Sequence, residues 1–278
     1  MYTFGSLFAG IGGIDLGFER AGLTCKWQVE IDKYANRVLE KHWPNVNRWD
    51  DVCTFPPNDN RCWKVDIIAG GFPCQDISFA GKGEGLEGQR SGLFYEIIRL
   101  ARQLGPRAIV LENVAALLNR GLGSVLGELA KIGYDAEWHC IPAAAVGAPH
   151  IRDRVFILAY ADRDGLNKNA LGFIKSCSTP RVAAKLQDQG SRENTDPVSE
   201  QRQGVSEESL PWQQDLQRQL GRVCQDIGRQ WAVEPNVGRV AHGVPRKLDR
   251  IKGLGNAVVP QVAEVVAKIL ITRLEDIK

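Results

Sequence analysis

The sequence predicts an α/β fold, with a doubly wound, mostly parallel sheet and a smaller inserted region. Two observations predict it. Short apolar runs that end in glycines or in a carboxylate recur before residue 161, and such runs are typical of strands covered on both faces. Residues 162–236 show no period of 2 or 3.6 and are rich in glutamine and charged side chains, which indicates an insert with little core of its own.

The first strand and helix are joined by a glycine-rich turn. We predict a strand at Thr3–Phe8 and a helix at Ile14–Ala21, with three glycines in Gly10–Gly13 between them. Glycines there let the backbone approach a ligand, and a helix N-terminus offers unpaired N–H groups. A plain tight βα turn is the alternative. Asp15 stands where the dinucleotide pattern G-x-G-x-x-G needs its third glycine, which argues against a nicotinamide enzyme.

Two further strands end in groups suited to chemistry. Lys26–Glu30 ends in a carboxylate that could accept ribose hydroxyls. The run at Val65–Ala69 is closed by Gly70 and Gly71, so Cys74 falls just beyond its carboxyl end. Open α/β sheets bind ligands at that edge, where a nucleophile would be useful. The alternative for Cys74 is a small, inert core residue.

The strand Ala108–Val114 ends in Glu112 and Asn113. A carboxylate beside a nucleophile could act as a general acid, and burial would raise its pKa toward the working pH. A helix-capping or sheet-edge acid is the alternative. A last strand, Val155–Tyr160, follows Arg152 and Arg154. Strand alternation would point these two arginines the same way, as a pair of fixed cations, unless they form a solvated edge.

Five motifs in this order resemble those of the DNA (cytosine-5)-methyltransferase family. They are FAGIGG from Phe8, GGFPCQ from Gly70, LENV from Leu111, the R-x-R pair, and GNAVVP from Gly255. They are spread over nearly the whole chain outside about 162–230. The resemblance implies an S-adenosylmethionine-dependent methyltransferase fold and methylation of cytosine at C5 in a short duplex DNA sequence.

The family mechanism gives each catalytic residue a role. Cys74 would add as a thiolate to C6 of a flipped-out cytosine, which makes C5 nucleophilic toward the methyl group of S-adenosylmethionine. Glu112 would hold and protonate N3. Arg152 and Arg154 would favour the thiolate, and Asn113 would orient the base or the Cys74 loop. A base, expected to be water, would remove the C5 proton before Cys74 leaves.

The resemblance also assigns a cofactor pocket to nine residues: Phe8, Gly10, Ile11, Gly12, Glu30, Asp51, Leu93, Asn256 and Val258. Glu30 would bind the ribose, and Asp51 would face the adenine amine. Ile31 stands where many relatives have an aromatic residue, so adenine packing would be aliphatic. His150 replaces a frequent glutamine before the R-x-R pair.

The family architecture divides the chain into a catalytic and cofactor-binding domain at 1–161, a target-recognition region at 162–236, and a hinge segment with a returning helix at 237–278. Residues 161–230 hold ten Lys/Arg and ten Asp/Glu, so charge does not locate a DNA face there. A basic stretch at 239–250 suits phosphate contacts. The closing helix, Pro260–Asp276, has apolar residues at helical spacing and should pack on the sheet.

Global properties are compatible with this interpretation. The net charge is +2, so DNA binding must depend on local patches. We see no signal peptide and no apolar run near the ~18 residues of a membrane span. Seven cysteines at irregular spacings favour the reducing cytoplasm of a bacterial or phage-infected cell. The sequence contains no C-x-x-C pair, so we expect no structural zinc. We expect a monomer.

Three questions stay open at this point. The same constellation occurs in the family's RNA-directed branch, so a tRNA cytosine-5 methyltransferase is an alternative, as is an inactive DNA-binding relative. The short insert resembles that of solitary phage and prophage enzymes, but a partner restriction endonuclease is equally compatible. The recognition sequence is not readable from these residues.

Overall fold

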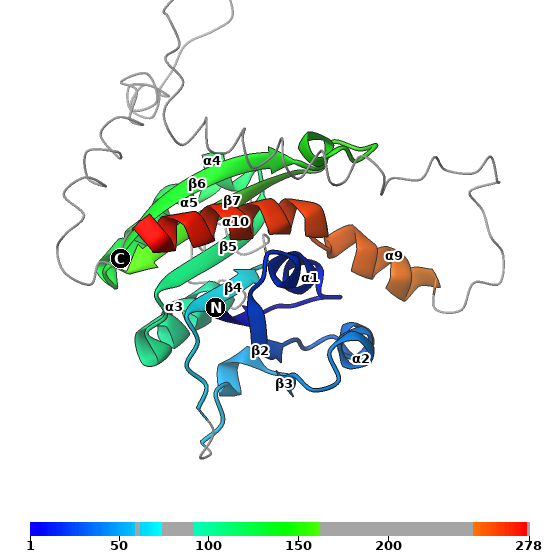
Figure 1. Cartoon of the computed structure of the whole chain (residues 1–278), viewed down its shortest axis with the longest axis horizontal. Helices are drawn as coiled ribbons and strands as arrows, with labels where there is room; N and C mark the ends of the chain where they lie inside the picture. The colour runs from blue at the N-terminus through cyan, green and yellow to red at the C-terminus, as the bar shows by residue number, and fades with distance from the viewer. Residues whose placement is uncertain (59–61, 74–91, 162–246, 277–278) are drawn as a thin grey trace, which may run out of the picture. The chain divides into compact units, whose positions relative to one another are not determined.

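The computed structural model describes residues 1–58, 62–73, 92–161 and 247–276 (Figure 1). All of them belong to the larger of two compact units, Met1–Ala161 with Asp215–Lys278. Cys74, the predicted target-recognition region 162–236 and the first part of the predicted hinge segment lie outside the described residues. The proposed domain boundaries therefore stay predictions.

A seven-stranded sheet of order β3-β2-β1-β4-β5-β7-β6 forms the centre of this unit. Its strands are β1 Thr3–Leu7, β2 Thr24–Val29, β3 Asn47–Trp49, β4 Ile67–Gly71, β5 Ala108–Val114, β6 Tyr134–Pro142 and β7 Asp153–Ala161. The first five are parallel, and β7 runs antiparallel to both β5 and β6. The predicted α/β class and mostly parallel sheet are confirmed.

The described helices are α1 Gly13–Arg20, α2 Lys33–His42, α3 Gly92–Leu104, α4 Leu117–Arg120, α5 Leu122–Lys131, α9 Lys247–Asn256 and α10 Pro260–Asp276, with short 3-10 turns η1 Val52–Thr54 and η3 Ala143–Val146. The predicted strands and helices lie within two residues of these bounds. The first strand ends at Leu7 because Phe8 has a left-handed backbone, with φ of 53°, that cannot continue a strand.

Neighbouring residues of each central strand face different sides of the sheet. Ile68 and Ile109 belong to the hydrophobic cluster that includes α3, whereas Ile67 and Val110 belong to the cluster that includes α1 and α10. All four side chains are fully buried. Burying each such side chain contributes about 1.5–3 kcal/mol. The continuous apolar runs in the sequence thus reflect a sheet covered on both faces.

Helix α10 packs on the sheet together with α1, as predicted from its apolar spacing (Figure 1). Gly17 of α1 permits this approach, because a Cβ there would lie 2.3 Å from the Pro260 carbonyl oxygen. By length and hydropathy, the stretch Leu248–Asp276 also qualifies as a candidate membrane span, contrary to the expectation from the sequence. A core helix passes the same test, and Val262, Val266 and Leu270 of α10 are buried in the core.

A buried polar cluster joins α1 to β1 and β2. The Asp15 side chain is fully buried. It accepts hydrogen bonds from Ser6 Oγ at 3.0 Å and Gln28 Nε2 at 2.9 Å, and a longer one from Cys25 Sγ at 3.7 Å. Burial raises the pKa of Asp15 to about 6, although these donors partly offset the effect. The cluster fixes the first turn of α1, directly after the glycine loop.

The raised pKa of Asp15 should make stability depend on pH. The folded protein holds this proton more tightly than the unfolded chain, so the stabilisation is complete below pH 3.8 and is lost as the pH rises through about 6. The shift corresponds to about 3 kcal/mol. Asp15→Asn removes the titration. Its free energy of unfolding, relative to wild type, should therefore increase by that amount between about pH 4 and pH 7. Urea denaturation measures the difference, and a pH-independent difference would contradict the assignment.

Candidate active site

The carboxyl ends of the parallel strands meet at one edge of the sheet and bring the predicted site residues there. Register pairs Leu7 with Gly70, and Gly71 with Glu112. Phe8 and Glu30 directly follow β1 and β2. The turn that leads to Cys74 therefore starts between the glycine loop on one side and Glu112 on the other.

The glycine loop and Glu30 hold each other in place. The Gly10 N–H donates to Glu30 Oε2 at 2.7 Å, and the Asp32 N–H donates to Glu30 Oε1 at 2.7 Å. Gly10 has a φ of 57° and Gly12 a φ of 87°, values that favour glycine. The half-buried Glu30 carboxylate is thus fixed at the strand end, with lone pairs remaining for two ligand hydroxyls.

Trp43 is a loop neighbour that the sequence did not single out. A Cβ on Gly12 would lie 2.4 Å from the Trp43 ring, so the ring packs where a side chain would be. Arg48 donates to the Trp43 carbonyl oxygen at 2.6 Å. The tryptophan follows α2 without a periodic or motif signal, so only the tertiary fold reveals this contact.

The other predicted cofactor residues lie around the same edge. Phe8 and Leu93, the second residue of α3, pack against one hydrophobic cluster. Asp51 accepts from the Cys53 N–H at 2.9 Å and caps η1. Ile31, next to Glu30, is 74% exposed, which leaves an aliphatic surface open to a ligand.

Glu112 and Arg154, both assigned to the catalytic centre by the resemblance, form an ion pair that the sequence did not predict. Arg154 Nε lies 2.8 Å from Glu112 Oε1, across the antiparallel strands β5 and β7. Only 8% of Glu112 is exposed. Burial raises the pKa of Glu112 above its ordinary value, and the positive charges of Arg154 and Arg152 partly offset this rise. A raised pKa favours the protonated form, in which a carboxyl group can donate a proton.

Asn113 and Gly71 shape the space around Glu112. Asn113 Nδ2 donates to the Phe72 carbonyl oxygen at 3.2 Å, which ties β5 to the turn before Cys74. A Cβ on Gly71 would lie 2.5 Å from Glu112 Oε2. Gly71, the last residue of β4, thus makes room for the carboxylate, although the sequence showed it only as a strand end.

Gly71→Ala should therefore displace the Glu112 carboxylate while the fold survives, since the obstructed atom is the end of a flexible side chain. Misplacement by about 1 Å can cost ~10² in rate, so we expect a loss of that order in turnover with little change in melting temperature. Gly127→Ala in α5, where an added Cβ meets nothing within 4 Å, is the matched control. Equal activity of the two variants would show that Gly71 does not set the position of Glu112.

Arg152 is not part of the strand whose alternation was expected to orient it. Its φ is 39°, and β7 begins one residue later, so the alternation does not extend to it. Arg152 Nη2 donates to the carbonyl oxygens of Gly255 at 2.7 Å and Ala257 at 2.6 Å. Arg152 and Arg154 thus bind different partners, although the positive charges of both act on Glu112.

The turn between α9 and α10 packs on the start of α1. A Cβ on Gly13 would lie 2.3 Å from the Val258 carbonyl oxygen, and Val258 is buried. Asn256, the last residue of α9, is exposed. Ile11, Gly12, Arg152 and Val258 line a groove of about 800 Å³ beside the glycine loop. This groove does not include Glu30 or Glu112 among its lining residues.

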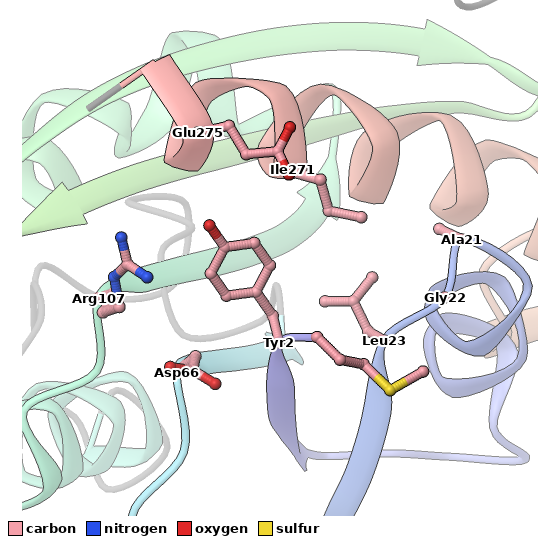
Figure 2. Close-up of a pocket in the computed structure, with 9 residues that line it drawn as sticks. Tyr2, Ala21, Gly22, Leu23, Asp66, Arg107, Ile271 and Glu275 are labelled. Atoms are coloured by element: carbon pink, nitrogen blue, oxygen red, sulfur yellow. The ribbon is translucent and has the colours of Figure 1, made fainter. Parts of the chain in front are cut away.

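A second cavity, of about 450 Å³, lies at the opposite edge of the sheet (Figure 2). Tyr2, Asp66 and Arg107 each precede a parallel strand, and the Arg107 guanidinium lies 5.2 Å from the centre of the Tyr2 ring. None of the predicted site residues lines this cavity. Among the described residues, no group of three or more His, Cys, Asp or Glu side chains is placed to hold a metal ion.

Comparisons with known proteins show the family to which the chain belongs. The family profile of the C-5 cytosine-specific DNA methylases matches residues 2–224. Type II methyltransferase M.NgoBI of Neisseria gonorrhoeae is 37% identical over 58% of this chain and 51% of its own. M.Eco47II of Escherichia coli is 40% identical over 57% and 39%, respectively. The chain thus spans about half, or less, of the length of these relatives.

Solved structures support the fold. A putative DNA modification methyltransferase encoded within a prophage of E. coli aligns with a TM-score of 0.59 at 18% identity, covering 99% of this chain and 100% of the other. A mutant of Spodoptera frugiperda DNMT2 aligns with a TM-score of 0.50 at 24% identity, covering 59% and 51%. The predicted methyltransferase fold is confirmed.

Proposed function

Because the chain belongs to the C-5 cytosine-specific DNA methylase family, we propose that it transfers the methyl group of S-adenosylmethionine to C5 of cytosine in a short duplex DNA sequence. The observation that carries this proposal is the buried Glu112–Arg154 pair at the sheet edge. It lies on the strand beside β4, whose following turn leads to Cys74. A proton donor and a thiol are thus expected on either side of one small site.

The residues around the glycine loop fit S-adenosylmethionine. Glu30, fixed by two backbone N–H groups, would accept the ribose hydroxyls, and the exposed Ile31 side chain would cover the adenine. Phe8, Gly10, Ile11 and Gly12 would contact the methionine and adenosine. Asp51, Leu93, Asn256 and Val258 would complete the pocket. When bound, the cofactor supplies an electrophilic methyl group on a sulfonium.

The protein's own side chains would carry the remaining steps. Cys74 adds as a thiolate to C6 of the cytosine while Glu112 gives a proton to N3, so the electron pair of the C5–C6 double bond becomes available at C5. C5 would then attack the electrophilic methyl group that the bound cofactor supplies, with cleavage of the bond between that methyl group and sulfur. A water molecule removes the C5 proton, the bond between C6 and sulfur breaks, and Cys74 leaves as a thiolate. Glu112 recovers its proton from N3.

Contacts of the described residues support these steps. Arg154 keeps the Glu112 carboxylate in one orientation at 2.8 Å. Burial favours the protonated form of Glu112, which is the form that donates to N3. Asn113 anchors the turn before Cys74 through the Phe72 carbonyl. The target base must leave the duplex to reach this edge, since stacking hides C5 and C6.

A competition experiment tests the substrate class. Radiolabelled methyl transfer is measured with duplex DNA, with unmodified tRNA, and with each as competitor of the other. We expect incorporation into DNA that tRNA does not inhibit at equal nucleotide concentration. Preferred incorporation into tRNA would replace DNA by RNA as the substrate. Cofactor binding without transfer to either would support an inactive DNA-binding relative.

The proposal extends to the oligomeric state, the cellular location and the biological role of the protein. We expect a monomer that acts on duplex DNA in the cytoplasm, with residues 162–236 reading the target sequence. The named relatives are type II methyltransferases, which favours a role in restriction and modification. A solitary enzyme of phage or prophage origin accounts for the same residues without a partner endonuclease.

A further inference from the structure

We propose that Arg152 is a positioning residue that clamps the turn between α9 and α10 onto the glycine loop, and that its loss weakens cofactor binding rather than the chemical step. The inference rests on the proposed function, because the glycine loop is taken to bind S-adenosylmethionine. It assigns the two arginines of the R-x-R pair to different tasks.

The Arg152 guanidinium binds carbonyl groups at the carboxyl-terminal end of α9. Its Nη2 donates to the Gly255 carbonyl oxygen at 2.7 Å and to the Ala257 carbonyl oxygen at 2.6 Å. These carbonyls lie in the last turn of α9 and just beyond it. Helix ends leave carbonyl groups without intrahelical partners, and a cation there also interacts favourably with the helix dipole. Arg152 therefore acts as a side-chain cap supplied by a distant part of the chain.

The turn that Arg152 holds packs against the start of α1. The Val258 carbonyl oxygen lies 2.3 Å from the position of a Cβ on Gly13, and a Cβ on Gly253 would lie 3.2 Å from Ile11 Cγ2. The first approach is between the clamped turn and the first residue of α1, and the second is between the end of α9 and the glycine loop. A turn that moved outward would release this side of the loop, whose other side is held by the bond from Gly10 to Glu30.

The backbone of Arg152 is in a strained, left-handed conformation, with a φ of 39°. Arg152 is one of two described non-glycine residues with positive φ, and the other is Phe8, at the start of the same loop. A left-handed conformation costs such residues of the order of 1–3 kcal/mol, and it persists where the surroundings enforce it. This conformation directs the Arg152 side chain to the α9 end, whereas Arg154, two residues later and inside β7, reaches Glu112.

The charges that face Arg152 are compatible with a clamp. Arg154 and Glu112 are its charged neighbours that affect its electrostatics most. A second link, between Lys252 Nζ and Asp32 Oδ2 at 2.7 Å, ties α9 to the N-cap of α2. The Lys252 side chain is 66% exposed and the Asp32 side chain 34% exposed, so solvent screens this second link and it should contribute little. Arg152 is thus expected to be the stronger of the two ties.

The test compares Arg152→Met, Arg152→Lys and Arg154→Met with the wild type. Two quantities are measured for each: the equilibrium dissociation constant for S-adenosylmethionine by calorimetry, and the single-turnover rate of methyl transfer at saturating cofactor. We expect Arg152→Met to weaken binding by about tenfold or more, the effect of losing charged hydrogen bonds, while the rate changes less than about threefold. Arg152→Lys, which keeps a charged donor, should recover much of the affinity. Arg154→Met should instead lower the rate at nearly unchanged affinity.

Two results would overturn the proposal. A reduced rate with unchanged affinity in Arg152→Met would make Arg152 a catalytic residue. If neither the rate nor the affinity changed, the clamp would have no role in cofactor binding. Absence of cofactor binding in the wild type would instead refute the proposed function. Hydrogen exchange of the cofactor-free protein then tests the clamp separately. Faster exchange of the amides at 255–263 in Arg152→Met supports the clamp, and equal exchange refutes it.

Discussion

Replacing Glu112 with glutamine should slow methyl transfer by about 10²–10⁴-fold, the usual range for loss of general-acid help. Glutamine has nearly the same shape and still offers Arg154 a hydrogen-bond acceptor, but it cannot deliver a proton to N3. Affinity for S-adenosylmethionine should therefore stay within about twofold of the wild type. The rate is measured in single-turnover experiments, so that product release does not mask the chemical step.

A matched control for this variant is Glu137→Gln. Glu137 is also a strand carboxylate with little exposure and an arginine neighbour, Arg273, whose Nε lies 3.4 Å from Glu137 Oε1. It lies on β6, away from the residues assigned to the site, and its replacement should leave the rate nearly unchanged. A loss of less than about threefold in Glu112→Gln would reassign Glu112 to a structural role.

Cys74→Ser should abolish turnover, with a loss of at least ~10⁴-fold in rate, because a serine hydroxyl is a far weaker nucleophile toward C6 at neutral pH. Cofactor affinity should be nearly intact, since the proposed pocket does not include this thiol. Cys140→Ser is the control, because Cys140 is an exposed free cysteine on β6. Undiminished activity of Cys74→Ser would remove the covalent mechanism altogether.

The sequence predicted the central strands well because their signal is local. Ile67 and Ile68, or Ile109 and Val110, are buried on opposite faces, so the strands appear as continuous apolar runs between glycines and carboxylates. It also predicted that Glu30 and Glu112 reach one edge, because parallel strands place their carboxyl ends together. The motifs assigned Glu112 and Arg154 to the catalytic centre without pairing them, and the direct ion pair at 2.8 Å appears only in the structure.

The sequence was less informative where long-range packing decides. Alternation pointed Arg152 and Arg154 the same way, but it does not extend to Arg152, which precedes β7 with a φ of 39° and donates to the Gly255 carbonyl oxygen. The contact of Trp43 with Gly12 and the room that Gly71 leaves for Glu112 depend on residues far apart in the chain. No periodicity encodes such contacts. The buried cluster around Asp15 likewise requires the fold to bring Ser6 and Gln28 together.

Identification of the methylated nucleoside tests the central claim most directly. Duplex DNA of mixed sequence is incubated with the protein and isotope-labelled S-adenosylmethionine, digested to nucleosides, and separated by liquid chromatography with mass detection. We predict that the label appears in 5-methyl-2′-deoxycytidine and is absent when Cys74→Ser replaces the wild type. Label in N4-methylcytosine or N6-methyladenine, or no label in DNA while the cofactor still binds, would contradict the assignment of this site to cytosine C5.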